Sequence, residues 1–473
     1  QALARSGEVK GEIGDTHIEV ICESDAKRII IRDRGIGMTS DEVQKYLNQI
    51  AFSSAGEFLE KYKDNSIIGH FGLGFYSAFM VADKVEVVTR SWQEGAEAVR
   101  WTCAGDPSFS IETVEKEERG TDVILYINEE NNSFLDQHRL EGLLEKYCKF
   151  LPIPIQFGTK TEYKTVGEGE EQKEESTEVP NIINDTNPIW KKQPVDLQDA
   201  DYLAFYRQTH PMAPEPMFWI HLNIDYPFNL TGVLYFPKLG NAMEVTRNKI
   251  HLYSNQVFVT DDVRDIVPEW LLLLHGVIDS PDIPLNVSRS YLQADGNVKK
   301  ISEYITRKVA DKLNELFKND RPSYEQKWRD LGVFVKYGVI SDKKFEERAM
   351  NFTLVENTQG AFFLLDEYKE KIKTNQTDKH GKVVVIYTND PEAHNAQITA
   401  ATGRGYDVLR LETVLDNHWI QHIEYQQGQL GLVFVRVDSE TLDNLVQKDE
   451  KRESILSEAE QNEINFITSS NRL

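Results

Sequence analysis

Two glycine-rich segments set the architecture expected for this chain: Asp33-Arg34-Gly35-Ile36-Gly37-Met38 and, further on, Gly69-His70-Phe71-Gly72-Leu73-Gly74-Phe75. Glycine lets backbone N–H groups approach a phosphate closely, and it tolerates the positive φ angles of a loop that points those groups inward. The second segment precedes a helix pattern over 76–82, where an anion is favoured. The pair predicts a split nucleotide-binding site, although the first segment alone is as compatible with a bare tight turn.

Neither segment has one of the common phosphate-binding fingerprints. No Gly-Lys-Ser/Thr follows the second segment, as a Walker A loop requires, and no single βαβ unit surrounds either segment. Residues 51–68 lie between the two and are rich in serine, glycine and charge. Two interpretations of this stretch stay open: a mobile lid over bound nucleotide and an ordinary surface loop.

The surrounding sequence predicts a mixed fold. Clusters and alternations of β-branched residues indicate strands at 17–22, 27–32, 85–90, 98–102, 109–112 and 121–127. Thr39-Ser40-Asp41-Glu42 is typical of a helix start, and apolar residues recur at helical spacing over 140–147. We expect an antiparallel sheet covered by helices on one face, which is the α+β class.

Length and composition predict several domains. With 473 residues, the chain exceeds the size that one hydrophobic core usually supports, so two to four domains are expected. Residues 167–175 contain no apolar residue, which favours a charged linker over 159–185; a solvated acidic loop inside one domain is the alternative. Aromatic-rich strands follow at 217–224, 231–236 and 252–259, then a helix at 301–317. A strand–helix–strand pattern over 383–411 suggests a small βαβ unit.

The charge balance and the cysteines exclude several functions. A formal net charge of -24 repels phosphate backbones, so we expect no nucleic-acid partner. No stretch approaches the roughly 20 apolar residues of a membrane-spanning helix, so we expect no membrane partner. Cys22, Cys103 and Cys148 have neither metal-ligand spacing nor an even count, so no protein-held metal is expected and a reducing, cytoplasmic location fits best.

Longer strings carry a family resemblance. Residues 33–39, residues 68–77 and Gly120-Thr121 are similar to the ATP-binding signatures shared by DNA gyrase, the ninety-kilodalton heat-shock chaperones, sensor histidine kinases and the MutL repair proteins. The ending Phe75-Tyr76-Ser77 resembles the chaperone branch, and its bacterial members in particular.

The second half of the chain agrees with that branch. Residues 187–190, 268–271 and 282–289 resemble the middle domain of the chaperone family in the same order. The resemblance implies an ATP-binding domain over 1–158, incomplete at its start, and after the linker an α/β middle domain over 186–438 whose large part ends at about residue 320. Residues 439–473 would begin a C-terminal domain.

The resemblance also assigns roles to the glycine-rich segments. It implies that Asp33 accepts a hydrogen bond from the adenine amino group, with Thr121 and a water nearby, and that Gly37 and Met38 line the base pocket. It implies backbone donors to the phosphates in the second segment, at Gly69, Phe71, Gly72, Leu73, Gly74 and Phe75. Asp33 as a simple cap of the following turn is the alternative.

Two middle-domain residues complete the implied catalytic set. Arg289 resembles the arginine that reaches the γ-phosphate, and Gln293 resembles its companion. A guanidinium offers planar, bidentate contact to phosphoryl oxygens. Without the resemblance, Arg289 would be taken for a surface salt-bridge residue. The implied cofactors are ATP and Mg²⁺.

This sequence departs from the family's pattern at several points. The family's water-activating glutamate and Mg²⁺-holding asparagine belong to a helix before Gln1, so no general base is assigned, and we expect this fragment to hydrolyse ATP weakly or not at all. The chain opens without methionine on what looks like a helix end, and residues are expected upstream. Phe52 replaces a lysine that relatives carry near the lid, and Tyr46 stands where many have asparagine.

The function implied is that of an ATP-driven molecular chaperone acting on non-native client proteins. The parent protein is expected to form a homodimer through a C-terminal domain that this chain does not contain. A sensor histidine kinase, a DNA-acting ATPase of the same superfamily and a passive holdase are the alternatives. Trp190, Phe218 and Trp219 are either client contacts or core residues, and aromatic residues in strands usually pack inward.

Overall fold

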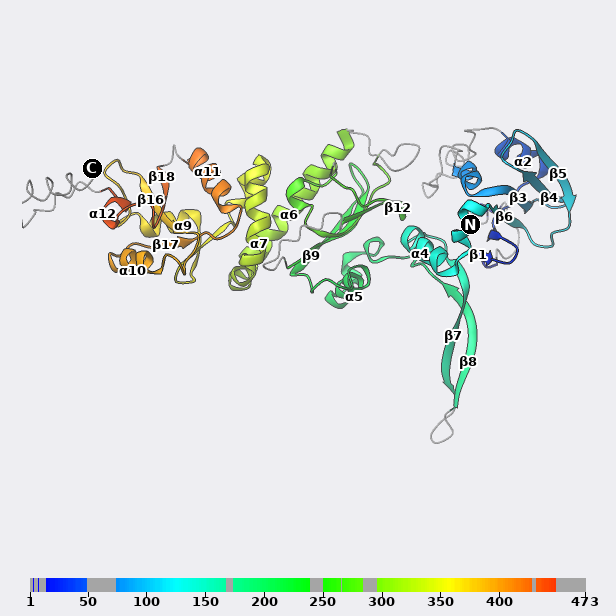
Figure 1. Cartoon of the computed structure of the whole chain (residues 1–473), viewed down its shortest axis with the longest axis horizontal. Helices are drawn as coiled ribbons and strands as arrows, with labels where there is room; N and C mark the ends of the chain where they lie inside the picture. Colours follow the sequence, from blue (N-terminus) through cyan, green and yellow to red (C-terminus); the bar gives the residue numbers. More distant parts are fainter. Residues whose placement is uncertain are drawn as a thin grey trace, which may run out of the picture. The chain divides into compact units, whose positions relative to one another are not determined.

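The described residues form three sheets with accompanying helices, shown in Figure 1. The structure is a computed structural model, and it describes residues 3, 7, 14–48, 74–166, 173–238, 250–264, 266–283, 296–427 and 431–447. The chain divides into two compact units, Gln1–Ile305 and Thr306–Leu473. Each unit is described by itself.

The first sheet has eight strands in the order β5-β4-β3-β6-β2-β1-β7-β8. Their bounds are β1 (Ile18–Glu23), β2 (Arg28–Asp33), β3 (Ala82–Arg90), β4 (Ala98–Cys103), β5 (Phe109–Val114), β6 (Gly120–Ile127), β7 (Ile155–Val166) and β8 (Lys173–Ile182). The strands predicted from the sequence between residues 17 and 127 are confirmed to within a few residues. The six predicted strands pair antiparallel, as predicted, and β7, which was not predicted, joins β1 in parallel through Ile18 and Ile155.

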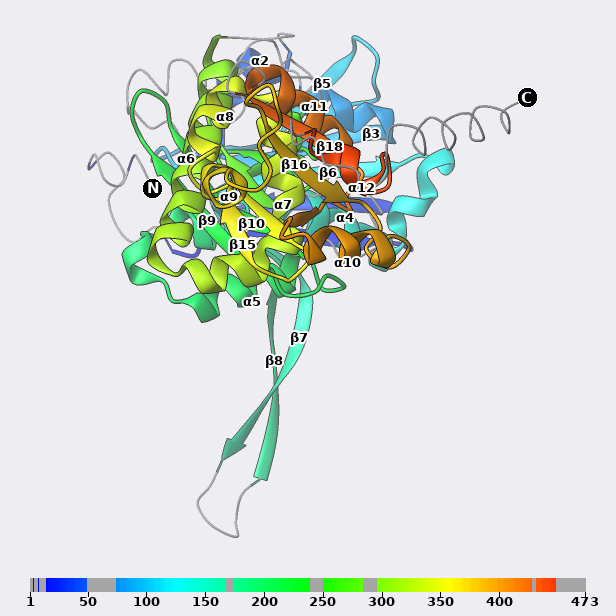
Figure 2. The ribbon, with the colours of Figure 1, turned by 90° about the vertical axis from the view of Figure 1, so that its left-hand side faces the viewer.

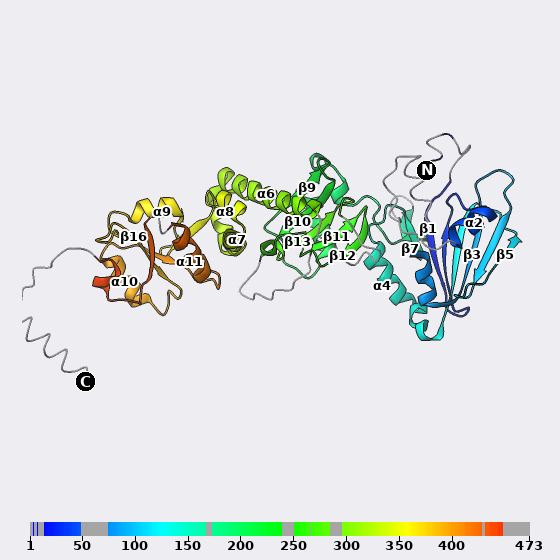
Figure 3. The same ribbon diagram turned by 90° about the horizontal axis from the view of Figure 1, so that it is seen from above.

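Helices pack against this sheet (Figure 3). They are α2 (Ser40–Leu47), the 3₁₀ helices η1 (Gly74–Met80) and η2 (Glu129–Leu135), and α4 (Gln137–Cys148). Thr39 caps α2 with a capping box shared with Glu42, as its sequence predicts. The one fully buried residue of α2, Val43, belongs to a core cluster with Val85 and Trp101. The helix-covered α+β sheet is therefore confirmed.

Strands β7 and β8 form a long hairpin that stands away from the rest of the sheet (Figure 2). Its register runs from Gln156 opposite Ile182 to Val166 opposite Lys173. Most of the segment predicted as a charged linker, 159–185, is thus β-strand, which the sequence reading did not predict. Threonine, tyrosine and valine between 159 and 166 favour strands. A two-stranded ladder pairs the backbone groups between its strands and leaves the outer ones to water, so it can form without burying many side chains. The domain limits themselves stay predictions.

The second sheet, also in the first unit, has the order β12-β11-β13-β10-β9. Its strands are β9 (Phe218–Ile224), β10 (Leu230–Phe236), β11 (Ile250–Ser254), β12 (Val257–Thr260) and β13 (His275–Asp279), with helices η4 (Ile189–Lys191), η5 (Pro194–Asp196), α5 (Asp199–Thr209) and η6 (Glu269–Leu271). The single strand predicted over 252–259 is two strands, because Asn255 and Gln256 take positive φ angles and make a turn.

Aromatic side chains fill the core beside this sheet. Trp190 is 1% exposed and packs against Phe150 with ring centroids 4.7 Å apart. Phe218 is buried, and the half-buried Trp219 stacks on Tyr202 at 5.2 Å. The core interpretation of Trp190, Phe218 and Trp219 is therefore favoured over client contact.

The second unit contains a small sheet in the order β15-β14-β17-β16-β18 and several helices. The strands are β14 (Leu354–Asn357), β15 (Phe362–Leu364), β16 (Val383–Thr388), β17 (Val408–Arg410) and β18 (Leu432–Arg436); the helices are α6 (Gly296–Asn319), which begins in the first unit, α7 (Arg321–Ser341), α8 (Lys343–Ala349), α9 (Leu365–Ile372), α10 (Asn395–Gly403), α11 (Asp416–Gln427) and α12 (Leu442–Leu445). β16 pairs in parallel with β17 and β18, so the predicted βαβ unit is confirmed. No helix in the described ranges has the length and apolar character needed to cross a membrane.

Candidate nucleotide-binding site

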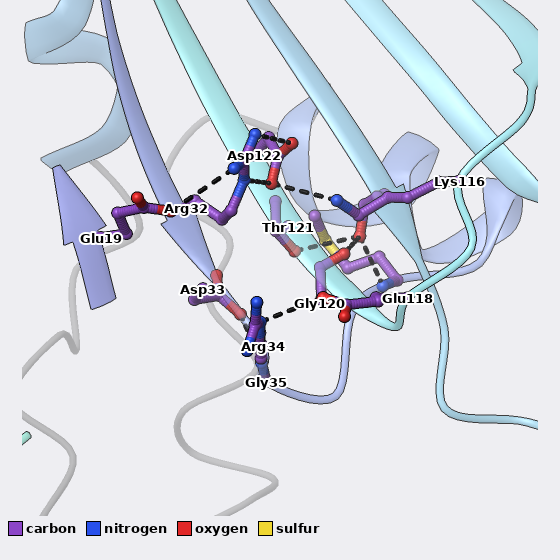
Figure 4. A network of polar contacts seen from close by, with 12 residues as sticks. Glu19, Arg32, Asp33, Arg34, Gly35, Lys116, Glu118, Gly120, Thr121 and Asp122 are labelled. Atoms are coloured by element: carbon purple, nitrogen blue, oxygen red, sulfur yellow. Dashed lines mark hydrogen bonds and ion pairs between the residues drawn. The ribbon is translucent and has the colours of Figure 1, made fainter. Parts of the chain in front are cut away.

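Three polar residues lie side by side on neighbouring strands of the first sheet. Asp33 ends β2 and stands opposite Thr121 on β6, which stands opposite Thr89 on β3. Directly opposed residues in an antiparallel pair project to the same face, so the three side chains form one row. Figure 4 shows Asp33 and Thr121 beside Gly120. The sequence singled out Asp33 and Thr121, and the structure brings them together.

The Asp33 carboxylate is held in a half-buried position. Its Oδ1 accepts a hydrogen bond from the Gly35 backbone N–H at 2.7 Å. Burial raises the pKa of Asp33 above its usual value, and the backbone hydrogen bonds from Gly35 and Thr121 oppose that shift. The turn-capping role considered from the sequence is confirmed as a contact, and it engages one of the two carboxylate oxygens.

Thr89 is a site residue that sequence reasoning missed. Its hydroxyl is fully buried and accepts a hydrogen bond from the Met38 N–H at 2.9 Å. It lies 3.2 Å from the Gly120 carbonyl oxygen and 3.0 Å from the Thr121 hydroxyl. Thr89 therefore links the first glycine-rich segment to β6. A threonine at the end of the apolar strand pattern 85–89 was the only sequence signal for it.

Gly37 and Gly120 owe their identity to close backbone packing. Gly37 has φ +60°, and a Cβ built there would lie 1.9 Å from the Arg90 carbonyl oxygen. Gly120 has φ +117°, and its Cβ would lie 2.1 Å from the Asp33 carbonyl oxygen. Both positions exclude a side chain. Gly37 thus fixes the segment 33–38 against β3, and Gly120 lets β6 approach Asp33.

Met38 and Phe75 pack against one apolar cluster. Both are partly buried against Val85 and Trp101, and the Phe75 and Trp101 rings meet edge to face at 5.7 Å. The helix predicted at 76–82 is instead the 3₁₀ helix η1, which begins at Gly74. Gly74 is exposed, and no described atom outside its chain neighbours lies within 4 Å of its Cβ position. The Gly74 carbonyl oxygen accepts a hydrogen bond from the Ser77 hydroxyl at 2.6 Å.

Ion pairs lie close to Asp33 and Thr121, on the opposite face and at the edge of the sheet (Figure 4). Arg32 contacts Asp122 at 3.1 Å, and Lys116 contacts the same carboxylate at 3.0 Å. Arg34 pairs with Glu118 at 3.0 Å. These side chains line a small cleft of about 200 Å³ that also includes Asp33. They hold the loop between β5 and β6 near the end of β2.

The remaining predicted site residues lie outside the described ranges. These are Gly69, Phe71, Gly72, Leu73, Arg289 and Gln293, together with Phe52. The stretch 51–68 considered as a lid also lies outside them. Their roles stay predictions.

The described part of the site fits the base of a nucleotide. A carboxylate is the natural acceptor for an exocyclic amino group. Met38, which is partly buried against the apolar cluster, offers an apolar side chain suited to the ring of a base. The described residues do not form a site for Mg²⁺ by themselves, because no group of three or more His, Cys, Asp or Glu side chains among them could hold a metal ion.

Two protein-family models match this chain. A family model described as "Histidine kinase-, DNA gyrase B-, and HSP90-like ATPase" matches residues 12–121, and one described as "Hsp90 protein" matches residues 168–470. The row of Asp33, Thr121 and Thr89 falls within the first match, so the N-terminal region is an ATPase-type domain of that class. The chain belongs to the Hsp90 family.

Individual relatives agree with this assignment. "Chaperone protein HtpG" of Porphyromonas gingivalis (strain ATCC 33277) is 54% identical over 462 residues, which cover 97% of this chain and 66% of that protein. The protein of the same name from Bacteroides thetaiotaomicron is 52% identical over 464 residues, covering 98% of this chain and 67% of its own. That from Alkalilimnicola ehrlichii is 34% identical over 447 residues. The chain spans 66% of the length of the first of these relatives.

Proposed function

We propose that this protein is an ATP-dependent molecular chaperone that binds and hydrolyses ATP and acts on non-native client proteins. The observation that carries the proposal is the row formed by Asp33 and Thr121, which presents acceptors for a purine base in a chain of the Hsp90 family. Its relatives from Porphyromonas gingivalis and Bacteroides thetaiotaomicron are named as chaperones. The comparisons favour this branch over a sensor histidine kinase or a DNA-acting ATPase.

The described residues support binding and orientation of the nucleotide. Asp33 accepts the adenine amino group with its carboxylate, whose Oδ1 also accepts the Gly35 N–H that caps the turn. Gly37 and Met38 line the base through the segment that packs against β3. Gly74 and Phe75, with Gly69, Phe71, Gly72 and Leu73, supply backbone donors to the phosphates. Mg²⁺, held mainly by those phosphates, supplies charge neutralisation when bound.

Arg289 and Gln293 are proposed to complete the site from the second region. A guanidinium at the γ-phosphate stabilises the charge that develops during phosphoryl transfer. No residue of this sequence is assigned as the general base. The full-length protein is proposed to be a cytoplasmic homodimer that joins through a C-terminal domain.

Steady-state ATP hydrolysis by the full-length protein tests this function. We expect Arg289→Ala to lower kcat on the order of a hundredfold with a small change in KM, and Arg289→Lys to restore little of the loss because an ammonium cannot bind in the same bidentate way. Equal rates for wild type and Arg289→Ala would refute the proposed role of Arg289.

A second assay separates a chaperone from a passive holdase. The full-length protein is mixed with a thermally denatured reporter enzyme, with and without ATP, and light scattering and recovered reporter activity are followed. ATP-dependent recovery that needs about tenfold more ATP in Asp33→Asn than in wild type supports the proposal. Suppression of scattering that is the same with and without ATP would favour the holdase.

A further inference from the structure

We infer that Thr89 sets the choice of purine base at this site, because it fixes the Thr121 hydroxyl as a hydrogen-bond acceptor beside Asp33. The inference rests on the proposed function, since it concerns the base that the Asp33 site binds. Thr89 acts through Thr121, so it is a positioning residue.

The position of Thr89 is unusual for a polar side chain. It is 0% exposed and sits near the end of β3, whose inward residues Val85 and Val87 are buried and apolar. A buried hydroxyl is costly unless its hydrogen bonds are made. Thr89 must therefore be satisfied by its neighbours, and the described part of the chain offers it three polar partners: Met38 N, Gly120 O and the Thr121 hydroxyl.

A count of protons decides how these partners are joined. The Met38 N–H can only donate, and the Gly120 carbonyl can only accept. A threonine hydroxyl has one proton and two lone pairs. All three contacts are hydrogen bonds only when Thr121 donates to Thr89 and Thr89 donates to Gly120. The alternative, in which Thr89 donates to Thr121, leaves the Gly120 carbonyl without that bond.

This arrangement determines what Thr121 offers to a ligand. Its proton is committed to Thr89, so its oxygen presents lone pairs on the same face as the Asp33 carboxylate. Two neighbouring acceptors match the exocyclic amino group of adenine, directly or through a water. The 6-oxo group of hypoxanthine or guanine is itself an acceptor and finds no donor there. Sites built from fixed polar groups reject a ligand that leaves those groups unpaired.

Removing the Thr89 hydroxyl would release Thr121. In Thr89→Val the Thr121 hydroxyl has lost its acceptor and can turn to donate to a 6-oxo group. The preference for ATP over inosine triphosphate should then fall, whereas Thr89→Ser keeps the hydroxyl and the preference. A purely structural Thr89 predicts something else: lower stability and equal weakening of both nucleotides.

The test is calorimetric titration of the full-length protein with ATP and with inosine triphosphate, together with thermal melting of each variant. We expect the ratio of the two Kd values to shrink roughly fivefold in Thr89→Val, as one lost hydrogen bond predicts, and to stay at the wild-type value in Thr89→Ser. Thr121→Val should shrink the ratio as well, and the double variant should add little because both act through one hydroxyl.

The outcomes separate the two claims. If wild type binds ATP but the ratio is unchanged in Thr89→Val, Thr89 is structural and the inference falls while the proposed function stands. If wild type binds neither nucleotide, the proposed function falls and the inference falls with it. Should Thr89→Val fail to fold, Thr89→Ala supplies the same measurement, because it also lacks the hydroxyl and places no methyl group against the Met38 N–H and the Gly120 carbonyl.

Discussion

Gly37 leaves no space for a side chain beside Arg90, since a Cβ at residue 37 would lie 1.9 Å from the Arg90 carbonyl oxygen. A hydrogen bond between nearby residues strengthens this contact, because the Trp92 N–H donates to the Ile36 carbonyl at 2.7 Å. The first glycine-rich segment is therefore docked on the end of β3 through its backbone. Its second glycine serves packing, and through packing it places Met38.

Gly37→Ala should destabilise the protein by about 2 kcal/mol or more, because alanine at φ +60° is strained and its Cβ clashes with backbone. Chemical denaturation monitored by tryptophan fluorescence measures the loss. Gly74→Ala is the matched control, since its Cβ meets open space among the described residues. We expect that variant to keep its stability within about 0.5 kcal/mol.

The control variant also carries information on the phosphate site. If the Gly74 backbone approaches a phosphate, Gly74→Ala should weaken ATP binding while the melting temperature stays unchanged. Unchanged ATP affinity in a stable Gly74→Ala protein would remove Gly74 from the proposed phosphate contacts.

Asp33→Asn should separate stability from binding. Burial raises the pKa of Asp33 in the folded state, so the native carboxyl holds its proton to a higher pH than the unfolded one. Between the unfolded value of 3.8 and the raised native value, the native state binds more protons. Stability from this group therefore falls as pH rises through that window. Asparagine cannot ionise, so the Asp33→Asn protein does not lose this stability as pH rises.

Denaturation of both proteins from acidic to neutral pH provides the check. The free energy of unfolding of Asp33→Asn should rise relative to that of wild type as pH increases. The ATP affinity of Asp33→Asn at neutral pH should be about tenfold lower, which is the difference between a charged and a neutral acceptor. A stability difference that does not change with pH would contradict the burial argument. Comparing the two proteins cancels the titration of all other carboxylates.

Local sequence patterns predicted much of this fold for an identifiable reason. Val85, Val87 and Trp101 alternate with polar residues along their strands, and each proved buried. The Thr39 capping box is also a local signal. Asp33 and Thr121 were paired only through the family resemblance, because their contact joins strands that are distant in sequence.

The sequence could not reveal the features that depend on register. Thr89 becomes a site residue only because β3 pairs with β6 in one alignment, which no local pattern specifies. The hairpin of β7 and β8 was missed because its strands bury little, so that low hydrophobicity suggested a linker. The sequence analysis linked Gly37 to the nucleotide, whereas the structure shows that a side chain at residue 37 would clash with the Arg90 carbonyl oxygen.

Replacing residues 159–180 with a short turn should leave the rest of the first sheet intact. β7 touches β1 only from Ile155 to Phe157, so the rest of the hairpin lies beyond the described pairing with β1. We expect ATP affinity within about twofold of wild type and a free energy of unfolding within about 0.5 kcal/mol. Hydrogen exchange of β1 and β2 provides a local readout. Faster exchange in β2 would show that the hairpin supports the site.

A buried ion pair ties α7 to α11 in the second unit and offers a last test. Lys336 and Asp416 have side chains 6% and 3% exposed, and their Nζ and Oδ1 atoms lie 2.5 Å apart. Asp416 also accepts a hydrogen bond from the Thr413 N–H at 2.8 Å. Lys336→Met keeps the volume but leaves the carboxylate without its cation, and an uncompensated buried charge costs about 3 kcal/mol.

Arg348 and Asp311 supply the matched control in the same unit. Their side chains are 50% and 55% exposed at 2.9 Å, so Arg348→Met should cost at most about 1 kcal/mol. Urea denaturation of both variants measures the two costs. Adding Asp416→Leu to Lys336→Met should recover part of the loss, because it removes the orphaned charge. Equal costs for Lys336→Met and Arg348→Met would mean that water reaches Asp416, and that the α7–α11 contact is looser than its geometry implies.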